Sequence, residues 1–541
     1  MDQRDFDLAQ NYYNKTLPKL AKLLNTAHEI NKSDRYWEII VGHWLWRFTK
    51  VCINRFNTID SLFGGVKTVR LIDYDDGDYR FCTKNGLSSV LSFRDNRWNY
   101  EFFRLIIKKY YANRIALIQK KRGDSVRNKA ASPINPPQNR GFLQSFYIVI
   151  NYFSSLLSSR DKYFLISTYL PRFQELFLHI TLGQLPRIHL SKEIGETGVI
   201  DESLRNGLKS DLCEFEAHNG FELFQFIDAA IFDSMPISYL EDFKKVRACV
   251  ESMPWPKNPK LIFTANNFDF DEVFKIYAAE KCEKGATYLV GQHGGVYGSY
   301  RYVNNPSIEE KTSDYFLTWG HKWNSKHVPS CMLNANFISK IRHKKEGYIT
   351  LIEAVERERV ETHDTCYEYH QYFQSQTRFV NSLSPMALDR LLIRLGPDFK
   401  TRIQSEDLRW SDFNNKIKLD LGRTPVLDIY KNSSLIVHSY DSSGLLETLA
   451  LNIPTIGFWE TGYTHLRDES RGDYKLLKDA GILFFSAESA AQAINELNGE
   501  FDAWWFSPKI QDARSQFTEI YCNQIDNRWS KLKSNFIAVR A

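Results

Sequence analysis

The chain has 541 residues, of which 43% are hydrophobic and 25% are charged, a balance that excludes disordered, collagen-like and disulfide-scaffold proteins. At about 150 residues per domain, this length predicts two or three domains. The 70 Lys and Arg residues exceed the 65 Asp and Glu residues by too little for charge to indicate a nucleic-acid partner, and we expect none.

The eight cysteines are scattered without a CxxC pair or a Cys/His cluster at zinc spacing. Neither a zinc site nor a disulfide framework is therefore expected. The first residues are polar and acidic, and no run approaches the ~18 uninterrupted apolar residues of a spanning helix. The closest run, residues 142–157, is interrupted by polar side chains. We therefore expect a cytoplasmic protein, with at most peripheral contact with a membrane.

Residues 1–120 predict amphipathic helices that are rich in aromatic side chains. LPKLAKLLNTAHEI and DRYWEIIVGHWLWRFTKVCINRF both repeat apolar residues at spacings of three and four. Residues 120–140 carry three prolines and no periodicity, which predicts an exposed loop. Its basic residues could contact anionic lipid or a polyanionic glycan, but a solvated loop is the simpler interpretation. They are Lys120, Lys121, Arg122, Arg127 and Lys129.

From about residue 160, short apolar runs alternate with helical segments, which predicts parallel α/β sheets. The expected strands are KYFLIST, KLIFTAN, ATYLVGQHGG, DYFLTWG, YITLIEA, RLLIRLG, KIKLDL, SSLIVHS, IPTIGFW and GILFFS. A polar stretch between Trp323 and Gly347 suggests a domain boundary near residue 340. We predict an α/β protein with two Rossmann-like lobes, residues 1–340 and 347–541, with α/β structure in the first lobe over 160–340 and closing helices at the end of the second.

The most informative segment is SLIVHSYDSSGLLETLALNIPTIGFW, which begins at Ser434 and reads as strand, polar turn, helix and strand. A helix that starts at Ser442, Ser443 and Gly444 presents free backbone N–H groups and a positive dipole end to a phosphate. Glu447, one turn later, is placed to accept hydrogen bonds from a ribose. Ordinary capping is the alternative, although the S-x-x-E spacing of a capping box fails at Ser443. We assign nucleotide binding to Ser439, Asp441, Ser442, Ser443 and Glu447.

Two basic residues at strand ends could complete the nucleotide site. Arg394, in RLLIRLGPD, could bind the phosphate in a bidentate manner. Lys418, in IKLD, could neutralise the leaving group, although a surface charge is an equally good interpretation.

A second segment, LIFTANNFDFDEVFKIYAAEKCEKGATYLVGQHGGVYG, contains two further strand ends. His293 ends the second strand, and the two glycines after it would let a substrate approach the backbone. A histidine there suits proton transfer or a hydrogen bond to a sugar or phosphate. A structural histidine that bonds its own loop is the alternative. We predict substrate contacts from Asn266, Asn267, Gln292, Gly294 and Gly295.

These motifs resemble a known family. The Ser-rich turn with its Glu-bearing helix resembles the nucleotide-binding half of CDP-glycerol glycerophosphotransferases and capsule Kdo transferases. TANNFDFDEVFKIYAAEKCEKG, GQHGG, SDYFLTWG, RLLIRLGPD and IKLDLG resemble the bacterial surface-carbohydrate (capsule or O-antigen) biosynthesis transferases. That family includes retaining transferases of pseudaminic acid and related nonulosonic acids.

The resemblance implies a GT-B-like fold, with the acceptor on the first lobe and the nucleotide on the second. It implies a CMP-activated sugar as donor and a glycan or lipid-linked oligosaccharide as acceptor, used in the cytoplasm near the inner membrane. His293 would either protonate the leaving phosphate or orient the donor carboxylate. Because no DxD motif ends a strand, and DYDDGD lies in the helical region, we expect no divalent metal and no cofactor.

Retention through double displacement requires a carboxylate nucleophile. The candidates are Asp269, Asp271, Glu241 and Asp95, and spacing does not choose among them. Asp271 could equally be a helix N-cap. The enzyme alternatives are a CDP-polyol phosphotransferase and a β-Kdo transferase. A non-catalytic scaffold is favoured only by the 14% aromatic share, with Trp44, Trp46, Trp504 and Trp505 exposed; we expect these side chains to pack in the core instead.

Overall fold

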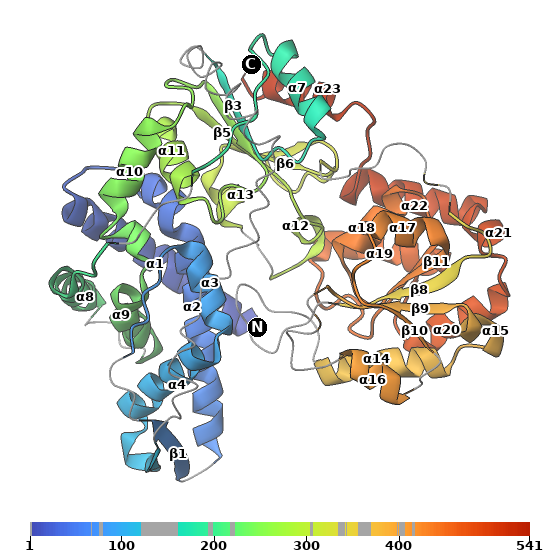
Figure 1. The fold of residues 1–541 in the computed structure, drawn as a ribbon, viewed down its shortest axis with the longest axis horizontal. Helices are drawn as coiled ribbons and strands as arrows, with labels where there is room; N and C mark the ends of the chain where they lie inside the picture. Colours follow the sequence, from blue (N-terminus) through green and yellow to red (C-terminus); the bar gives the residue numbers. More distant parts are fainter. Residues whose placement is uncertain are drawn as a thin grey trace.

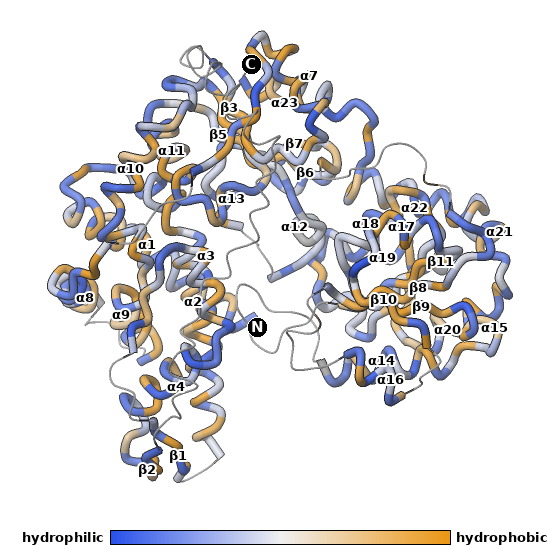
Figure 2. The backbone as a smooth tube through the Cα atoms, in the orientation of Figure 1, coloured by the Kyte–Doolittle hydropathy of each residue, from blue (hydrophilic) through white to orange (hydrophobic). Residues whose placement is uncertain are grey.

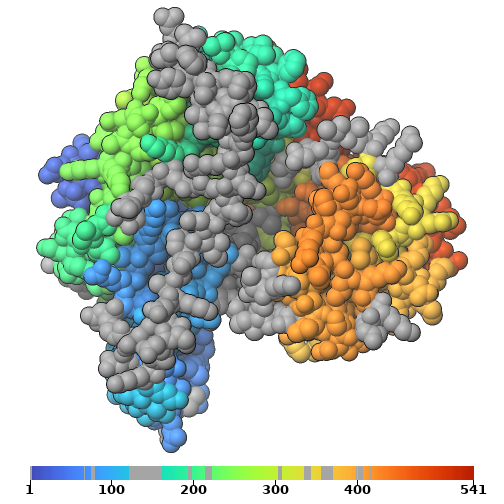
Figure 3. All heavy atoms as spheres, viewed as in Figure 1, coloured from blue at the N-terminus to red at the C-terminus, as the bar shows by residue number. Residues whose placement is uncertain are grey.

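The computed structural model describes residues 3–65, 68–74, 79–120, 161–192, 198–216, 222–302, 307–333, 341, 343–354, 369–397, 399, 406–413 and 417–540. The basic residues 121–129, the apolar run 142–157 and residues 75–78 of DYDDGD lie outside this range. Figure 1 shows two α/β lobes, with the N-terminal helices extending from the first. Figure 3 shows the lobes as separate masses, the second of them mainly orange.

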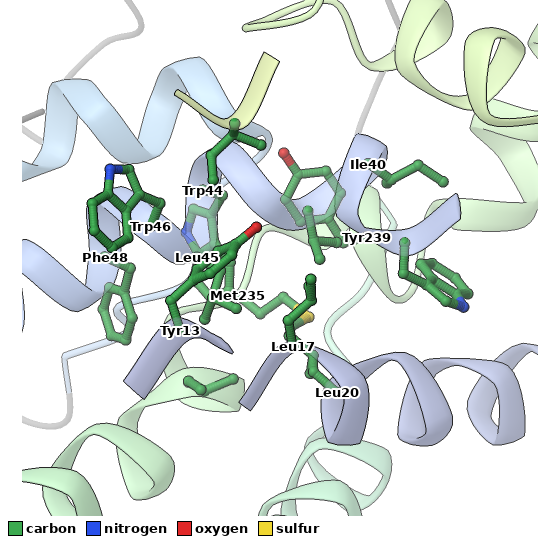
Figure 4. Close-up of a cluster of buried hydrophobic side chains, with 14 of the residues drawn as sticks. Tyr13, Leu17, Leu20, Ile40, Trp44, Leu45, Trp46, Phe48, Met235 and Tyr239 are labelled. Carbon is green, nitrogen blue, oxygen red and sulfur yellow. The ribbon is translucent and has the colours of Figure 1, made fainter. Parts of the chain in front are cut away.

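The first lobe begins with two long helices that pack against each other. Tyr13 and Leu17 of α1 face Leu45 of α2, and Met235 and Tyr239 close the same cluster (Figure 4). Along these helices, hydrophobic and hydrophilic stretches alternate (Figure 2). The helices of this region are α1 (Gln3–His28), α2 (Asp34–Gly64), α3 (Gly86–Arg94), α4 (Asn96–Tyr110), α8 (Glu202–Glu216), α9 (Glu222–Ser234) and α10 (Phe243–Ser252), with short turns η1 (Ala112–Arg114) and η3 (Ile237–Tyr239).

The expectation of helix throughout residues 1–120 is wrong at two places. β1 (Val69–Tyr74) and β2 (Ile115–Lys120) form a parallel pair. Asp73 of DYDDGD lies on β1 rather than on a helix, and its carboxylate is buried against Arg104 and Lys108 of α4. Each strand is a six-residue run that includes β-branched residues, which is too short to form a stable helix.

A five-stranded parallel sheet of order β3-β4-β5-β6-β7 forms the centre of the first lobe. Its strands are β3 (Tyr163–Ile166), β4 (Leu261–Thr264), β5 (Thr287–Gly291), β6 (Tyr315–Thr318) and β7 (His327–Pro329). The connecting helices are α7 (Arg172–Thr181), α11 (Glu272–Cys282), α12 (Val296–Ser299) and α13 (Ile308–Thr312). Four of these strands were expected; β7 was not.

A six-stranded parallel sheet of order β10-β9-β8-β11-β12-β13 forms the second lobe. Its strands are β8 (Tyr348–Ile352), β9 (Leu391–Arg394), β10 (Lys418–Asp420), β11 (Ser433–His438), β12 (Thr455–Phe458) and β13 (Leu483–Phe484), as the sequence predicted. Its helices are α14 (Tyr369–Asn381), α15 (Pro385–Asp389), α16 (Glu406–Phe413), α17 (Val426–Asn432), α18 (Ser443–Ala450), α19 (Asp468–Ala480), α20 (Ala487–Leu497) and α21 (Phe501–Trp505). Helices cover both faces of the sheet (Figure 1). The prediction of two Rossmann-like lobes is confirmed.

The end of the chain connects the lobes. α22 (Pro508–Tyr521) packs on α19 of the second lobe, whereas α23 (Arg528–Ala538) packs on α7 of the first. The ring of Phe536 stacks on Tyr163, with centroids 6.4 Å apart. The expected second lobe, residues 347–541, therefore closes with a helix that returns to the first lobe.

No described helix is both long enough and apolar enough to cross a membrane. Trp44, Trp46 and Trp505 are buried and Trp504 is half-buried, so the core interpretation of these side chains is confirmed.

Candidate active site

A pocket with a cavity volume of about 50 Å³ lies in the first lobe, where α2 faces the ends of β4 and β5. This volume has room for a few water-sized groups. Its lining comes from α2 (His43, Trp46, Arg47), the loop after β4 (Phe268, Asp269), the turn after β5 and α12 (His293, Tyr297) and the start of α13 (Ser307, Ile308, Glu309). Two of the predicted catalytic residues, Asp269 and His293, are thus brought together.

Asp269 and Arg47 form the fixed charge pair of the pocket. Both carboxylate oxygens of Asp269 accept hydrogen bonds from the Arg47 guanidinium, with Nη2 2.8 Å from Oδ2. Burial alone would raise the pKa of Asp269, but the charge and hydrogen bonds of Arg47, together with the charges of His43 and Lys275, outweigh burial and hold this pKa below its usual value. Asp269 is therefore ionised at neutral pH.

His293 belongs to a chain of polar side chains. Its Nδ1 lies 3.0 Å from the hydroxyl of Tyr297, which in turn donates a hydrogen bond to Oε1 of Glu309. Burial lowers the pKa of His293 to about 4 and raises the pKa of Glu309 to about 7. His293 is therefore neutral at neutral pH and able to accept a proton.

α2 carries two more buried ionisable residues, His43 in the pocket lining and Lys50 one turn beyond Arg47. His43 stacks on Phe268, and its Nε2 and Nδ1 lie 3.8 Å from Glu309 and 3.9 Å from Asp269. Burial lowers its pKa to about 3. Lys50 is buried with its Nζ 5.2 Å from the ring centroid of Trp46, and burial lowers its pKa to about 7. α2 therefore supplies a neutral histidine and a lysine that titrates near neutrality.

The QHGG turn is held by contacts within the protein. The buried side chain of Gln292 accepts from the Trp319 amide and donates to the Gly294 carbonyl, both at 2.8 Å. A Cβ on Gly295 would lie 2.8 Å from Leu446 of α18, so this glycine permits a close approach of the second lobe. The substrate contacts of Gln292, Gly294 and Gly295 stay predictions.

Asn266, Asn267 and Asp271 make local contacts. The backbone amides of Asn266 and Asn267 donate to Thr264 Oγ1 at 3.2 and 3.0 Å. The Asn267 side chain donates to Asp271, which also accepts from the Phe274 amide at 3.0 Å. Asp271 is therefore the N-cap of α11. Of these three residues, the exposed Asn266 keeps its side chain available near the pocket.

Glu241 and Asp95 lie away from the pocket. Glu241 binds Arg205 through both oxygens, at 2.7 and 2.8 Å. Asp95 is the N-cap of α4 and accepts from the Trp98 amide at 2.8 Å. Neither lines the pocket. Among the four candidate carboxylates, Asp269 is therefore the one that the structure places beside His293.

The helix start in the second lobe uses its serines in protein contacts. Ser442 is the N-cap of α18 and accepts from the Leu445 amide at 3.2 Å, so ordinary capping, the alternative to phosphate binding, is present one residue before the Ser443 at which the capping-box spacing fails. Ser443 Oγ accepts a hydrogen bond from the Gly295 amide at 2.9 Å. The start of α18 therefore lies against the QHGG turn.

The side chains of Ser439 and Asp441 are buried beneath the turn before α18 and stabilise it by hydrogen bonds. The Ser439 hydroxyl is buried, lies 2.7 Å from the Tyr372 hydroxyl and donates to the Ile352 carbonyl at 2.9 Å. The Asp441 carboxylate is buried and accepts from Tyr474 at 2.8 Å. These side chains support the turn, and their contact with a nucleotide stays a prediction.

The two predicted basic residues differ in position. Arg394 lies at the carboxyl end of β9, where it forms an ion pair with Asp420 of β10. Lys418 begins β10, two residues before that edge, and its Nζ lies 5.2 Å from the ring centroid of Tyr348 at the start of β8. The role of Lys418 in neutralising a leaving group stays a prediction, for a residue that lies two positions before the edge at which Arg394 lies.

Glu447 is half-buried on the second turn of α18. Its Oε2 accepts a hydrogen bond from Tyr430 at 3.4 Å, and burial raises its pKa to about 6. The position suits a group that hydrogen-bonds a polar ligand beside the helix start.

The segment around α12 binds the two lobes together next to the pocket. The Tyr300 hydroxyl donates to the Asp441 carbonyl at 2.7 Å, and the Arg301 amide donates to the His465 carbonyl at 2.9 Å. Together with the Gly295 contact, these bonds place the first-lobe pocket beside the start of α18; Figure 1 shows α12 next to α18.

Four ionisable residues of the pocket were not predicted from the sequence: His43, Arg47, Tyr297 and Glu309. His43 and Arg47 are four residues apart in an otherwise apolar helical stripe, a signal that was available. Glu309 reaches the pocket only through the fold, because it lies beyond the strand and turn that carry His293.

Comparisons with known proteins found a matching family and similar solved structures. The sequence model of a family described as "LIC12162 family transferase" matches residues 2–537. No curated protein sequence matches. Among solved structures, the chain is similar to UDP-GlcNAc 2-epimerase from Neisseria meningitidis bound to UDP-GlcNAc, at 13% identity and a TM-score of 0.35, covering 70% of this chain and 98% of that one. It is also similar to the wall teichoic acid polymerase TagF soaked with CDPG, at 10% identity and a TM-score of 0.33, covering 73% and 95% of the two chains.

Proposed function

We propose that this protein, which belongs to the LIC12162 family of transferases, is a glycosyltransferase. In this proposal it transfers a nonulosonic acid, such as pseudaminic acid, from a CMP-activated donor to a glycan during bacterial capsule or surface-polysaccharide assembly. The observation that carries the proposal is the bond from the Gly295 amide to Ser443 Oγ, because it joins the pocket of Asp269 and His293 to the start of α18. A donor at this junction would have its phosphate at the helix start, with the carboxylate and anomeric carbon of its sugar at the pocket.

The nucleotide half of the proposal rests on the second lobe. The N-terminal end of α18 carries the positive end of the helix dipole, which favours a phosphate. Glu447 lies one turn further along, in reach of a ribose hydroxyl. Arg394 lies at the same edge of the sheet, but its pairing with Asp420 means that it would share its charge between that carboxylate and a phosphate.

The sugar half rests on the charges of the pocket. Nonulosonic acids carry a carboxylate next to the anomeric carbon. Arg47 uses two of its five N–H groups for Asp269, so others remain for a second carboxylate. Lys50, buried one turn along α2, adds positive charge when it is protonated. These two cations support an anionic sugar over a neutral one.

Retention requires two displacements in this proposal. Asp269 attacks the anomeric carbon, and the bond from that carbon to the phosphate oxygen breaks with its electron pair on CMP. The acceptor hydroxyl then attacks the same carbon, its proton passes to His293, and the bond to Asp269 breaks with its pair returning to the carboxylate. A neutral His293 suits this base role better than protonation of the leaving phosphate. The acceptor would be a glycan or lipid-linked oligosaccharide, met at the inner membrane surface.

The test compares donors. Purified protein is incubated with CMP-pseudaminic acid or with CDP-glycerol and a glycan acceptor, and CMP release and the product anomer are followed by NMR. The proposal predicts CMP release and a retained anomer with the CMP-sugar alone. Turnover of CDP-glycerol would instead support a polyol phosphotransferase. Binding of neither nucleotide would support a scaffold role.

A further inference from the structure

We propose that Tyr297 and Glu309 are positioning residues that hold His293 in one tautomer, with the proton on Nδ1 and the lone pair on Nε2. In the reaction proposed above, Nε2 would then be the atom that takes the acceptor proton. This role of Nε2 rests on the proposed function, whereas the tautomer itself does not. Tyr297 lies at the end of the segment that contains QHGG but was given no role there, and Glu309 lies outside that segment.

The direction of the hydrogen bonds carries the argument. Tyr297 has a single hydroxyl proton, which it donates to Oε1 of Glu309. Its oxygen can therefore only accept at His293 Nδ1, which lies 3.0 Å away. Nδ1 must then carry a proton, and in a neutral imidazole Nε2 carries none.

The charge states of the three groups agree with this direction. Burial raises the pKa of Tyr297 well above its usual value, so it keeps its proton. The pKa of Glu309 is about 7, so above that pH its carboxylate is an acceptor only. His293, with a pKa of about 4, stays neutral over the same range.

The charged and titratable pocket residues around His293, Tyr297 and Glu309 come from α2 and from the loop after β4. Arg47 and His43 of α2 face the pocket, and Asp269 follows β4. Arg47 is held by Asp269, and His43 reaches Oε2 of Glu309 only at 3.8 Å. Among the described residues, no hydrogen bond involves Nε2 of His293, so it is the ring nitrogen left for a substrate.

Once His293 accepts a proton, Tyr297 and Glu309 would also stabilise its positive charge. The imidazolium would donate from Nδ1 to Tyr297, whose hydroxyl bond to the Glu309 carboxylate strengthens it as an acceptor. The negative charge of Glu309 would thereby stabilise the positive ring without direct contact. Loss of either residue should weaken the base without removing it.

The first experiment measures the tautomer and needs no substrate. Protein labelled with ¹⁵N-histidine is studied by NMR at pH 8, and the His293 signals are assigned by their absence from a His293→Gln variant. We expect a protonated Nδ1 and an unprotonated Nε2 in the wild type, and a mixture of tautomers in Tyr297→Phe. Tyr302→Phe is the matched control, since it removes a hydroxyl that binds Gln3 instead. An Nε2–H tautomer in the wild type would overturn the proposal.

The second experiment measures turnover with the CMP-sugar. Tyr297→Phe and Glu309→Gln should each lower kcat about 10- to 100-fold, a part of the usual contribution of a general base, while the Kd of CMP stays the same. Glu310→Gln is the neighbouring control, because Glu310 binds His327. An unchanged kcat in both folded variants would contradict the positioning role. The expected tautomer without any turnover would instead reject the proposed function and leave this inference standing.

Discussion

Burial shifts the pKa values of acids and bases in the pocket in opposite directions, and in both cases it favours the neutral form. It raises the pKa of Glu309 to about 7, and it lowers the pKa values of His43 and His293 to about 3 and 4. Only Asp269 and Arg47 escape this effect, because each compensates the charge of the other. At neutral pH the pocket therefore combines one ion pair with neutral histidines, a setting in which a histidine accepts protons and a carboxylate can act as a nucleophile.

The ribose contact of Glu447 can be tested by a single substitution. Glu447→Gln should weaken CMP binding by about 1–3 kcal/mol, since a charged acceptor of a hydrogen bond is replaced by a neutral one. Isothermal titration with CMP and with deoxy-CMP measures the effect. The variant should also lose the preference for the ribose. Retention of the wild-type preference in the variant would rule out this role.

The sequence indicates which residues lie at strand ends better than it indicates the role of each of them. His293 and Asp269 were found because they follow strand ends, where polar residues in α/β proteins bind ligands. Ser439, Asp441 and Gln292 stand at equivalent strand ends, yet their side chains hold turns from inside. This difference depends on partners such as Tyr372, Tyr474 and Trp319, which come from distant segments. Local spacing contains no information about them.

At the scale of elements, the contact between the QHGG turn and α18 decides whether the two half-sites meet. The Gly295 amide binds Ser443, and its Cα faces Leu446. α12 and the residues after it add bonds to the loop before α19. The strands and helices thus act as rigid supports, and Gly295 allows them to approach.

Gly295→Ala tests this contact. The new Cβ would lie 2.8 Å from Leu446 Cδ1 and 3.3 Å from Ser443 Cα, so one lobe must shift. We expect a loss of about 1–3 kcal/mol in unfolding free energy, as for other overpacked sites, together with a larger fall in transfer rate. Gly294→Ala is the control, because its Cβ would meet no atom closer than 4.0 Å. Equal rates for the two variants, measured with the CMP-sugar, would contradict a role for the lobe contact.

The regular elements were predictable because their periodicity is local. The ten expected strands are apolar runs that end in small or polar residues, and the structure has all of them. β1, β2 and β7 were missed, since two lie within a region of helical periodicity and the third, His327–Pro329, has three residues. The return of α23 to the first lobe could not be predicted, because its apolar face matches either lobe.

At the scale of the whole molecule, stability should depend on pH through buried histidines in both lobes. His43 and His293 of the first lobe and His438 of the second have pKa values lowered by burial to about 3, 4 and 3. Their folded pKa values lie below the unfolded value of about 6.5, so the unfolded state binds more protons as the pH falls. Stability is therefore lost from about pH 6.5 downward, by about 2 kcal/mol per histidine at pH 5.

Urea unfolding between pH 7 and pH 5 measures this loss. The wild type should become less stable as the pH falls. In His438→Gln, the slope of the unfolding free energy against pH should be smaller by the equivalent of about one bound proton. Glu309 acts in the opposite sense, because its folded pKa of about 7 lies above its unfolded value; its contribution is lost as the pH rises through 7. A His438→Gln variant with the wild-type slope would show that His438 is not held neutral.

The central claim is that a sugar binds in the first-lobe pocket against Asp269 while its nucleotide binds at α18. Intact-mass and peptide mass spectrometry after addition of CMP-pseudaminic acid, without acceptor, tests it most directly. The account predicts a sugar adduct on Asp269, its absence in Asp269→Asn, and its presence in Asp271→Asn, where only a helix cap is lost. An inverted product with no adduct, or an adduct on another carboxylate, would contradict the account.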